Sequence, residues 1–215
     1  MREYVLERIR SLKIIAIARS IAPDKCLALA RALADGGIAL MELPYDQSRP
    51  DSWLSTAETV ERIANALGDR LLVGAGTVLT PELVELTHSH GGTFAVAPNT
   101  DRAVIRRAAE LGMVSVPGAM TPTEILAAHD ASADIVKLFP AAQLGTGYLK
   151  AIRAPISHVD ILAAGGITVE NAKSFLAAGA MSLGVGGALT DKAAIAEGRF
   201  GDISRAAEAL VRAVE

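Results

Sequence analysis

Residues 133–149 read A-D-I-V-K-L-F-P-A-A-Q-L-G-T-G-Y-L, an apolar run with one lysine, closed by a proline and two glycines. In an extended segment Lys137 shares a face with Ile135 and Phe139, and the opposite face is also apolar. Both faces are therefore suited to burial, as in a strand of a parallel sheet. Because Pro140 ends this strand, Lys137 lies close to its carboxyl end.

A lysine inside an apolar strand requires a reason. Burial penalises the charged ammonium, lowers its pKa and leaves a neutral amine that can attack a carbonyl carbon. The alternative is that Lys137 pairs with a buried carboxylate or extends to solvent, and this stretch alone favours neither.

Similar apolar runs recur along the chain every twenty to twenty-five residues or so, separated by Ala-rich helical stretches, a spacing typical of repeated βα units. The pattern predicts a single domain over residues 1–215, an α/β fold of the (β/α)₈ TIM-barrel type. The expected strands are Lys13–Arg19, Ile38–Leu43, Leu71–Ala75, Thr93–Ala97, Met113–Val116, Ile135–Phe139, Val159–Ala163 and Met181–Val185.

The sequence also indicates where helices start. Thr80 and Thr121 each precede a proline, which indicates an N-cap followed by proline at the first helical position. Glu124 lies three residues after Thr121 and completes a capping box. An extra N-terminal helix is predicted before the first strand, because Val5, Ile9 and Leu12 recur on one side of a charged segment.

Composition excludes several classes of function. Hydrophobic residues make up 51% and aromatics 4% of the chain, so the core relies on aliphatic side chains, as in helices packed on a parallel sheet. The net charge of -3 without a basic stripe argues against nucleic acid as a partner. No apolar run approaches the length of a membrane span, and Cys26 stands alone, so we expect a cytoplasmic protein.

A barrel of this kind carries its chemistry at the carboxyl ends of its strands, and four polar residues fall there. They are Arg19, Glu42, Thr77 and Lys137. Alternation predicts that each points inward with an apolar neighbour: Ile17, Leu40, Ala75 and Ile135, respectively. An amine to form an imine, a carboxyl to move protons, and a guanidinium and hydroxyl to hold a carboxylate make a set suited to carbonyl chemistry. The alternative is a buried ion pair between Glu42 and Lys137.

The last two strands end in glycine-rich turns, A-A-G-G-I-T and G-V-G-G-A-L. Backbone N–H groups there can bind an anion, which predicts a phosphate site at Gly165, Gly166, Gly186 and Gly187. Taken singly, each sequence favours a tight turn that binds nothing, but two such turns adjacent in the barrel favour the phosphate site.

No constellation of metal ligands stands out, so we expect neither a metal nor a cofactor. His88 and His90 have ligand-like spacing, but they precede a double glycine at a predicted helix end, away from the catalytic rim. Trp53 either lines the pocket or holds the following helix in place, and the sequence does not decide between these roles.

Five motifs occur in order along nearly the whole chain: E-L-P at 42–44, G-A-G-T-V-L at 74–79, V-P-G at 116–118, K-L-F-P at 137–140 and A-A-G-G-I at 163–167. Together they resemble the class I 2-keto-3-deoxy-6-phosphogluconate/4-hydroxy-2-oxoglutarate aldolases. The resemblance implies that Lys137 forms a Schiff base with pyruvate and that Glu42 moves protons. It further implies that Thr77 contacts the pyruvate-derived part, that the glycine turns bind a distal phosphate, and that the protein is a metal-free homotrimer.

Within that family the chain is more similar to the 2-dehydro-3-deoxy-6-phosphogalactonate branch. The segments that carry this similarity are I-I-A-I-A-R at Ile14–Arg19, A-P-N at Ala97–Asn99, V-I-R-R-A at Val104–Ala108 and F-P-A-A-Q-L-G-T-G-Y-L-K-A at Phe139–Ala151. The resemblance adds Pro98 and Asn99 to the expected substrate-binding residues.

Two positions depart from the family pattern. Asp46 stands where the gluconate branch has an arginine, so that Arg19 or Arg49 is expected to supply the positive charge. Gly187 stands where a serine often binds phosphate.

The expected activity is aldol cleavage of a phosphorylated 2-keto-3-deoxy acid, a small-molecule substrate, to pyruvate and glyceraldehyde 3-phosphate. The gluconate epimer, 4-hydroxy-2-oxoglutarate and an unphosphorylated keto acid are alternative substrates for the same chemistry. A phosphosugar isomerase or epimerase, with Glu42 as base and Lys137 as a binding charge, is a rival on the same barrel. A barrel that only binds a phosphorylated metabolite is a second rival.

Overall fold

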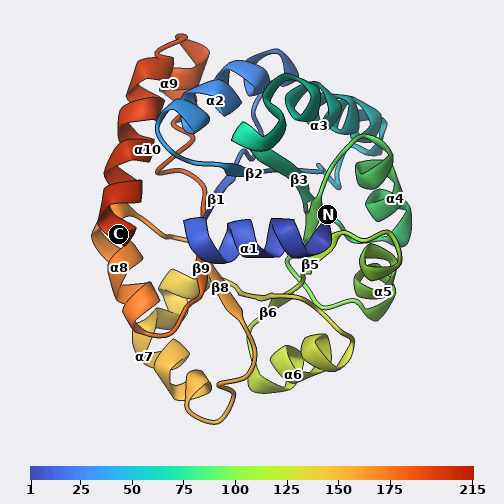
Figure 1. Ribbon diagram of the computed structural model, residues 1–215, viewed down its shortest axis with the longest axis vertical. Helices are drawn as coiled ribbons and strands as arrows, with labels where there is room; N and C mark the ends of the chain where they lie inside the picture. Colours follow the sequence, from blue (N-terminus) through green and yellow to red (C-terminus); the bar gives the residue numbers. More distant parts are fainter.

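The computed structural model describes residues 1–215 as a barrel of parallel strands surrounded by helices (Figure 1). The strands are β1 (Ile14–Ile17), β2 (Leu40–Pro44), β3 (Leu72–Gly76), β4 (Phe94–Val96), β5 (Val114–Val116), β6 (Gly118–Ala119), β7 (Val136–Leu138), β8 (Ile161–Ala164) and β9 (Ser182–Val185). The helices are α1 (Arg2–Leu12), α2 (Pro23–Asp35), α3 (Trp53–Leu67), α4 (Pro81–Ser89), α5 (Arg102–Glu110), α6 (Pro122–Asp130), α7 (Ala141–Arg153), α8 (Val169–Ala177), α9 (Lys192–Ala196) and α10 (Phe200–Val214), with short 3₁₀ turns at η1 (Pro50–Ser52) and η2 (Gly68–Arg70).

The predicted eight-stranded barrel is confirmed, and its fifth strand is divided in two. The strand order is β5-β4-β3-β2-β1-β9-β8-β7-β6, and only Pro117 separates β5 from β6. Proline has no N–H to donate to the ladder, so the strand is interrupted there. The β7 segment bridges the break, because the N–H of Ile135 donates to Ser115 O at 3.3 Å and the N–H of Lys137 donates to Pro117 O at 2.8 Å.

The barrel has an interior layer and an outer layer of apolar side chains. The interior cluster includes Ile15, Leu40, Leu72 and Leu162 from four strands, and Ile135 directly before β7. A larger cluster fills the space between the strands and the surrounding helices. The inward face of β2 and β7 therefore carries Glu42 and Lys137 into the barrel, two residues beyond Leu40 and Ile135.

The predicted inward orientation of Ala75 is wrong. Ala75 belongs to an outer cluster with Tyr45 and Val84, and the inward positions of β3 are Gly74 and Gly76. A side chain does not fit at Gly74, where an added Cβ would lie 2.4 Å from the carbonyl oxygen of Phe94. Thr77 nevertheless reaches the pocket mouth, because the chain leaves the strand with φ 54° at this residue.

The predicted N-terminal helix is confirmed as α1, which lies across the barrel in Figure 1. Val5 and Ile9 are fully buried in the interior cluster, so α1 covers one end of the barrel. Arg2 at the start of the helix forms a salt bridge of 2.8 Å with Asp134, a side chain that also accepts the N–H of Ser115. The opposite end, where the strands finish, is left for the functional site.

The helix starts agree with the predicted caps. The hydroxyl of Thr80 accepts the N–H of Leu83 at the start of α4, and Thr121 and Glu124 form the predicted capping box of α6. None of the helices combines the length and apolar character that a bilayer crossing requires.

Candidate active site

Lys137 lies in the middle of β7 and is almost entirely buried, with 5% of its surface exposed. Its inward direction follows from strand alternation with Ile135, and its Nζ atom lies 5.1 Å from the centroid of the Phe139 ring. Burial lowers the pKa of the Lys137 ammonium, and the positive charge of Arg19 lowers it further, whereas the negative charge of Glu42 acts in the opposite direction. The net shift makes the neutral, nucleophilic amine easier to form than in a solvent-exposed lysine.

Glu42 lies on β2 and is 2% exposed. Burial raises the pKa of its carboxyl group, and the charges of Lys137 and Arg19 only partly offset this. A carboxyl group with a raised pKa exchanges protons closer to neutral pH, as a general acid or base must. Its Oε1 atom has no hydrogen-bond partner in the protein.

The alternative of a buried ion pair is not what the structure contains. No salt bridge joins Glu42 to Lys137, and neither side chain donates or accepts a hydrogen bond within the protein. Both groups sense each other's charge, yet each keeps its reactive atoms free. Buried, unpaired titratable groups at the end of a barrel indicate a site built for a third molecule.

Eight of the ten predicted site residues line one cleft of about 950 Å³ at the carboxyl ends of the strands. They are Arg19, Thr77, Pro98, Lys137, Gly165, Gly166, Gly186 and Gly187. Glu42 does not contribute to the cleft lining, although its charge acts on Lys137.

Asn99 is not brought to this cleft. This exposed residue lines a separate small cavity with Asp101 and Ser115, and its backbone oxygen accepts the N–H of Gly118.

The two glycine turns differ in why they need glycine. Gly165 and Gly166 have φ values of 93° and 77°, in the left-handed region, and a Cβ at Gly166 would lie 2.5 Å from that of Ala142. These two residues are thus required by the backbone itself. Gly186 and Gly187 have no such restriction, since a Cβ on Gly187 would meet nothing within 4 Å. Both residues line the cleft without a side chain, so their backbone forms its wall there.

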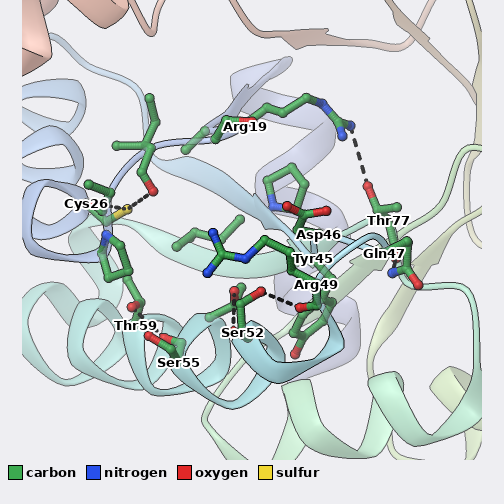
Figure 2. A pocket seen from close by; sticks show the side chains of 18 of the residues that line it. Arg19, Cys26, Tyr45, Asp46, Gln47, Arg49, Ser52, Ser55, Thr59 and Thr77 are labelled. Carbon is green, nitrogen blue, oxygen red and sulfur yellow. Dashed lines mark hydrogen bonds between the residues drawn. The ribbon is translucent and has the colours of Figure 1, made fainter.

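A second cavity of about 870 Å³ lies between the loops that follow β1 and β2 (Figure 2). Arg19 and Thr77 line both cavities, and the Nη2 atom of Arg19 lies 3.5 Å from Oγ1 of Thr77. Arg49 lines only the second cavity, whereas Lys137 lines only the cleft. Of the two arginines that the sequence left open, Arg19 is therefore the one in the cleft with Lys137.

Four charged or hydroxyl residues of the cleft were missed by sequence reasoning. Thr168 follows the first glycine turn, and Thr190, Asp191 and Lys192 line the cleft just beyond the second, where Lys192 forms no salt bridge. The available signal was their position a few residues after a glycine turn, in loops that have no periodicity to mark their inward side chains.

Trp53 holds a loop in place and does not line either cavity. Its indole Nε1–H donates to the backbone oxygen of Asp46 at 2.9 Å, and its ring meets that of Tyr45 edge to face.

Comparisons with known proteins agree with this geometry. A family model for KDPG and KHG aldolases matches residues 5–206. The 2-dehydro-3-deoxy-6-phosphogalactonate aldolase of Escherichia coli (strain K12) is 39% identical over 176 residues, which cover 81% of this chain and 83% of that protein. A probable 2-dehydro-3-deoxy-6-phosphogalactonate aldolase of Rhizobium meliloti (strain 1021) is 41% identical over 177 residues, covering 82% and 81% of the two chains.

Solved structures agree as well. One described as native KDPGal superimposes with a TM-score of 0.83 at 35% identity and covers 94% of each chain. The chain therefore belongs to the KDPG and KHG aldolase family, a family of carbon–carbon lyases.

Proposed function

We propose that this protein is a Schiff-base aldolase that reversibly cleaves 2-dehydro-3-deoxy-6-phosphogalactonate to pyruvate and D-glyceraldehyde 3-phosphate. The observation that carries the proposal is the buried, unpaired amine of Lys137 at the base of a cleft, with the unpaired carboxyl group of Glu42 close enough to shift its pKa. The choice of sugar acid follows the two relatives that are 39% and 41% identical and carry this substrate in their names.

The first half of the reaction makes the covalent intermediate. The neutral amine of Lys137 attacks the C2 carbonyl carbon of the keto acid, and the resulting carbinolamine takes up a proton from the solvent and loses water to give an iminium ion. Glu42, acting through a water molecule, then takes the proton of the C4 hydroxyl. The C3–C4 bond breaks, its electron pair moves into the iminium, and the aldehyde leaves.

The second half regenerates the lysine. Glu42 returns its proton to C3 of the enamine, and hydrolysis of the new iminium releases pyruvate, the free amine of Lys137 and the proton taken up earlier from the solvent. No electrons are exchanged with an external group, so the chemistry needs only these two residues and water.

The two ends of the substrate are assigned by charge. The carboxylate is placed against the guanidinium of Arg19 and the hydroxyl of Thr77, with Pro98 on the wall of the cleft. The phosphate is placed at the backbone N–H groups of Gly165, Gly166, Gly186 and Gly187, with the ammonium of Lys192 beside them. We also propose that Asn99 helps to select the configuration at C4 of the substrate. Because Asn99 does not line the cleft, it would have to act from outside it.

The proposal includes a cytoplasmic homotrimer. Large apolar side chains are exposed at Met120, Leu126 and Val169 between β6 and α8, and exposed apolar surface is typical of a subunit contact. The buried, unpaired Cys26 suits a reducing compartment. Light scattering after gel filtration tests the assembly. A mass three times that of the 22.3 kDa chain is expected, and a stable monomer would contradict it.

The test of substrate choice is a cleavage assay that couples pyruvate release to NADH oxidation by lactate dehydrogenase. The 6-phosphogalactonate-derived and 6-phosphogluconate-derived keto acids are compared with their unphosphorylated forms and with 4-hydroxy-2-oxoglutarate. We expect the largest kcat/KM for the galactonate epimer. If the gluconate epimer is cleaved ten or more times faster, the assignment is overturned. A tenfold difference in kcat/KM corresponds to about 1.4 kcal/mol in transition-state free energy.

A further inference from the structure

Thr77 has a backbone conformation that is unfavourable for a threonine. It follows β3 directly with φ 54°, in the left-handed region where a β-branched residue is an outlier. Its hydroxyl faces the guanidinium of Arg19 at 3.5 Å, at the boundary between the two cavities. Such a conformation persists only where neighbouring groups hold it, so the contacts of Thr77 decide where its hydroxyl points.

The contact that holds Thr77 comes from the loop after β2. The side-chain Nε2–H of Gln47 donates to the backbone oxygen of Thr77 at 2.8 Å, thirty residues away in the chain. Figure 2 shows the two side chains next to each other at one side of the second cavity. Gln47 is half-buried and lines only that second cavity, so it reaches Thr77 from behind the cleft.

The loop that presents Gln47 is itself fixed by Asp46. One carboxylate oxygen of Asp46 accepts both the N–H of Ser48 at 3.0 Å and its hydroxyl at 2.6 Å, which closes a tight turn around Gln47. The backbone oxygen of Asp46 accepts the indole N–H of Trp53 at 2.9 Å. The hydrogen bonds from Ser48 also hold the pKa of Asp46 below its usual range, so the acceptor is ionised at neutral pH.

Asp46 stands where the gluconate branch, by resemblance, has an arginine. In this structure its carboxylate faces its own loop and lines only the second cavity. A residue that turns toward the backbone cannot replace an arginine as a ligand for a carboxylate. Its effect on the cleft must pass through Gln47 and Thr77.

We propose that Gln47 is a positioning residue for the keto-acid carboxylate. It fixes the strained Thr77 so that the Thr77 hydroxyl and the Arg19 guanidinium form one binding site, and Asp46 braces the loop that carries it. The proposal rests on the aldolase function proposed above and adds two residues that act on substrate binding without contacting the substrate. It predicts an effect on the pyruvate half of the reaction alone.

The test uses full-length variants assayed in the aldol direction, with pyruvate and glyceraldehyde 3-phosphate varied separately. Gln47→Leu keeps the size of the side chain and removes its N–H donor. We expect the KM for pyruvate to rise about five- to tenfold, with kcat within about twofold and the KM for the aldehyde unchanged, as for loss of ground-state binding. Gln143→Leu, on an exposed face of α7 and outside both cavities, is the control and should change none of these values.

Asp46 gives a second, independent readout. Asp46→Asn retains an oxygen that accepts from Ser48, so it should keep a nearly normal KM for pyruvate. Asp46→Ala removes the acceptor and should match Gln47→Leu. If Asp46→Asn is as impaired as Asp46→Ala, the carboxylate acts on the substrate by its charge and the bracing role is wrong.

Wild-type protein is first treated with pyruvate and borohydride, which separates the two proposals. No adduct in the wild type means that the aldolase mechanism fails. An adduct in the wild type, with an unchanged KM for pyruvate in Gln47→Leu, overturns the positioning role alone. Thermal unfolding of every variant is measured alongside, and a KM effect that appears only in variants with a lowered Tm also counts against it.

Discussion

A β-carbon at position 76 would lie 2.7 Å from the Oε1 atom of Glu42, so the glycine of β3 and the carboxyl group of β2 fit together inside the barrel. The carbon of that carboxyl group would be 3.0 Å away, which leaves no room for even one methyl group. Gly76 therefore sets the place that Glu42 occupies, next to Lys137 but without an ion pair.

Gly76→Ala is expected to push the Glu42 carboxyl group out of place and lower kcat by at least about tenfold, the scale of a displaced general acid–base group. Imine formation by Lys137 should continue. Gly147→Ala on α7 is the control, because an added Cβ there meets nothing within 4 Å, and helix propensity predicts an equal or higher Tm. Steady-state kinetics of both variants test this, and a fully active Gly76→Ala would refute the packing argument.

The pH dependence of imine formation should reveal the charges around Lys137. Burial lowers the pKa of its ammonium below 10.5, and the attacking amine is the deprotonated form, so the rate should rise with pH through that lowered pKa. Glu42 raises this pKa and Arg19 lowers it. We therefore expect Glu42→Gln to move the midpoint to lower pH and Arg19→Met to move it to higher pH.

The measurement for this prediction is the initial rate of borohydride-trapped adduct with saturating pyruvate across a pH series. Shifts of the same sign in both variants would contradict the electrostatic account. Because Arg19→Met also weakens pyruvate binding, saturation is checked at each pH.

Lys192 should determine how strongly the enzyme prefers a phosphorylated aldehyde. It lines the cleft beside Gly186 and Gly187 and has no salt bridge, so its charge is free to meet a phosphate. Lys192→Met is expected to raise the KM for glyceraldehyde 3-phosphate about tenfold at low ionic strength, with a smaller effect in high salt. The KM for unphosphorylated glyceraldehyde should not change.

Lys173→Met, an exposed lysine on α8 outside the cleft, is the control for this change of charge. Equal losses with both aldehydes would show that Lys192 supports the cleft without recognising phosphate.

Periodicity predicted the parts of the site that lie on strands. Lys137 and Glu42 face inward because side chains alternate along β7 and β2, and this follows from the sequence directly. The predicted inward orientation of Ala75 was wrong for a local reason. The inward positions of β3 lie so close to Phe94 and Glu42 that only glycine fits there. The division of the fifth strand at Pro117 also has a local cause, because proline has no N–H for the sheet. Counting apolar runs along the sequence does not detect such a break.

The loop contacts were not predictable in the same way. Gln47 meets Thr77 through one hydrogen bond between two irregular segments, and neither segment has a period that fixes where a side chain points. Asn99 was assigned to the cleft by the resemblance to the family, but it lines a neighbouring cavity. Loop geometry depends on such individual bonds, so Lys192 and Gln47 emerged only from the structure.

The most direct test of the central claim is to treat the protein with pyruvate and sodium borohydride, then measure intact mass and map the modified peptide. The account predicts one reduced pyruvyl adduct per chain, located on Lys137. The adduct should also form in Glu42→Gln and in the surface control Lys150→Ala. Lys137→Ala should form no adduct and should not catalyse aldol cleavage. A folded Lys137→Ala that still forms the adduct, or that cleaves the keto acid at a near-normal rate, would contradict it.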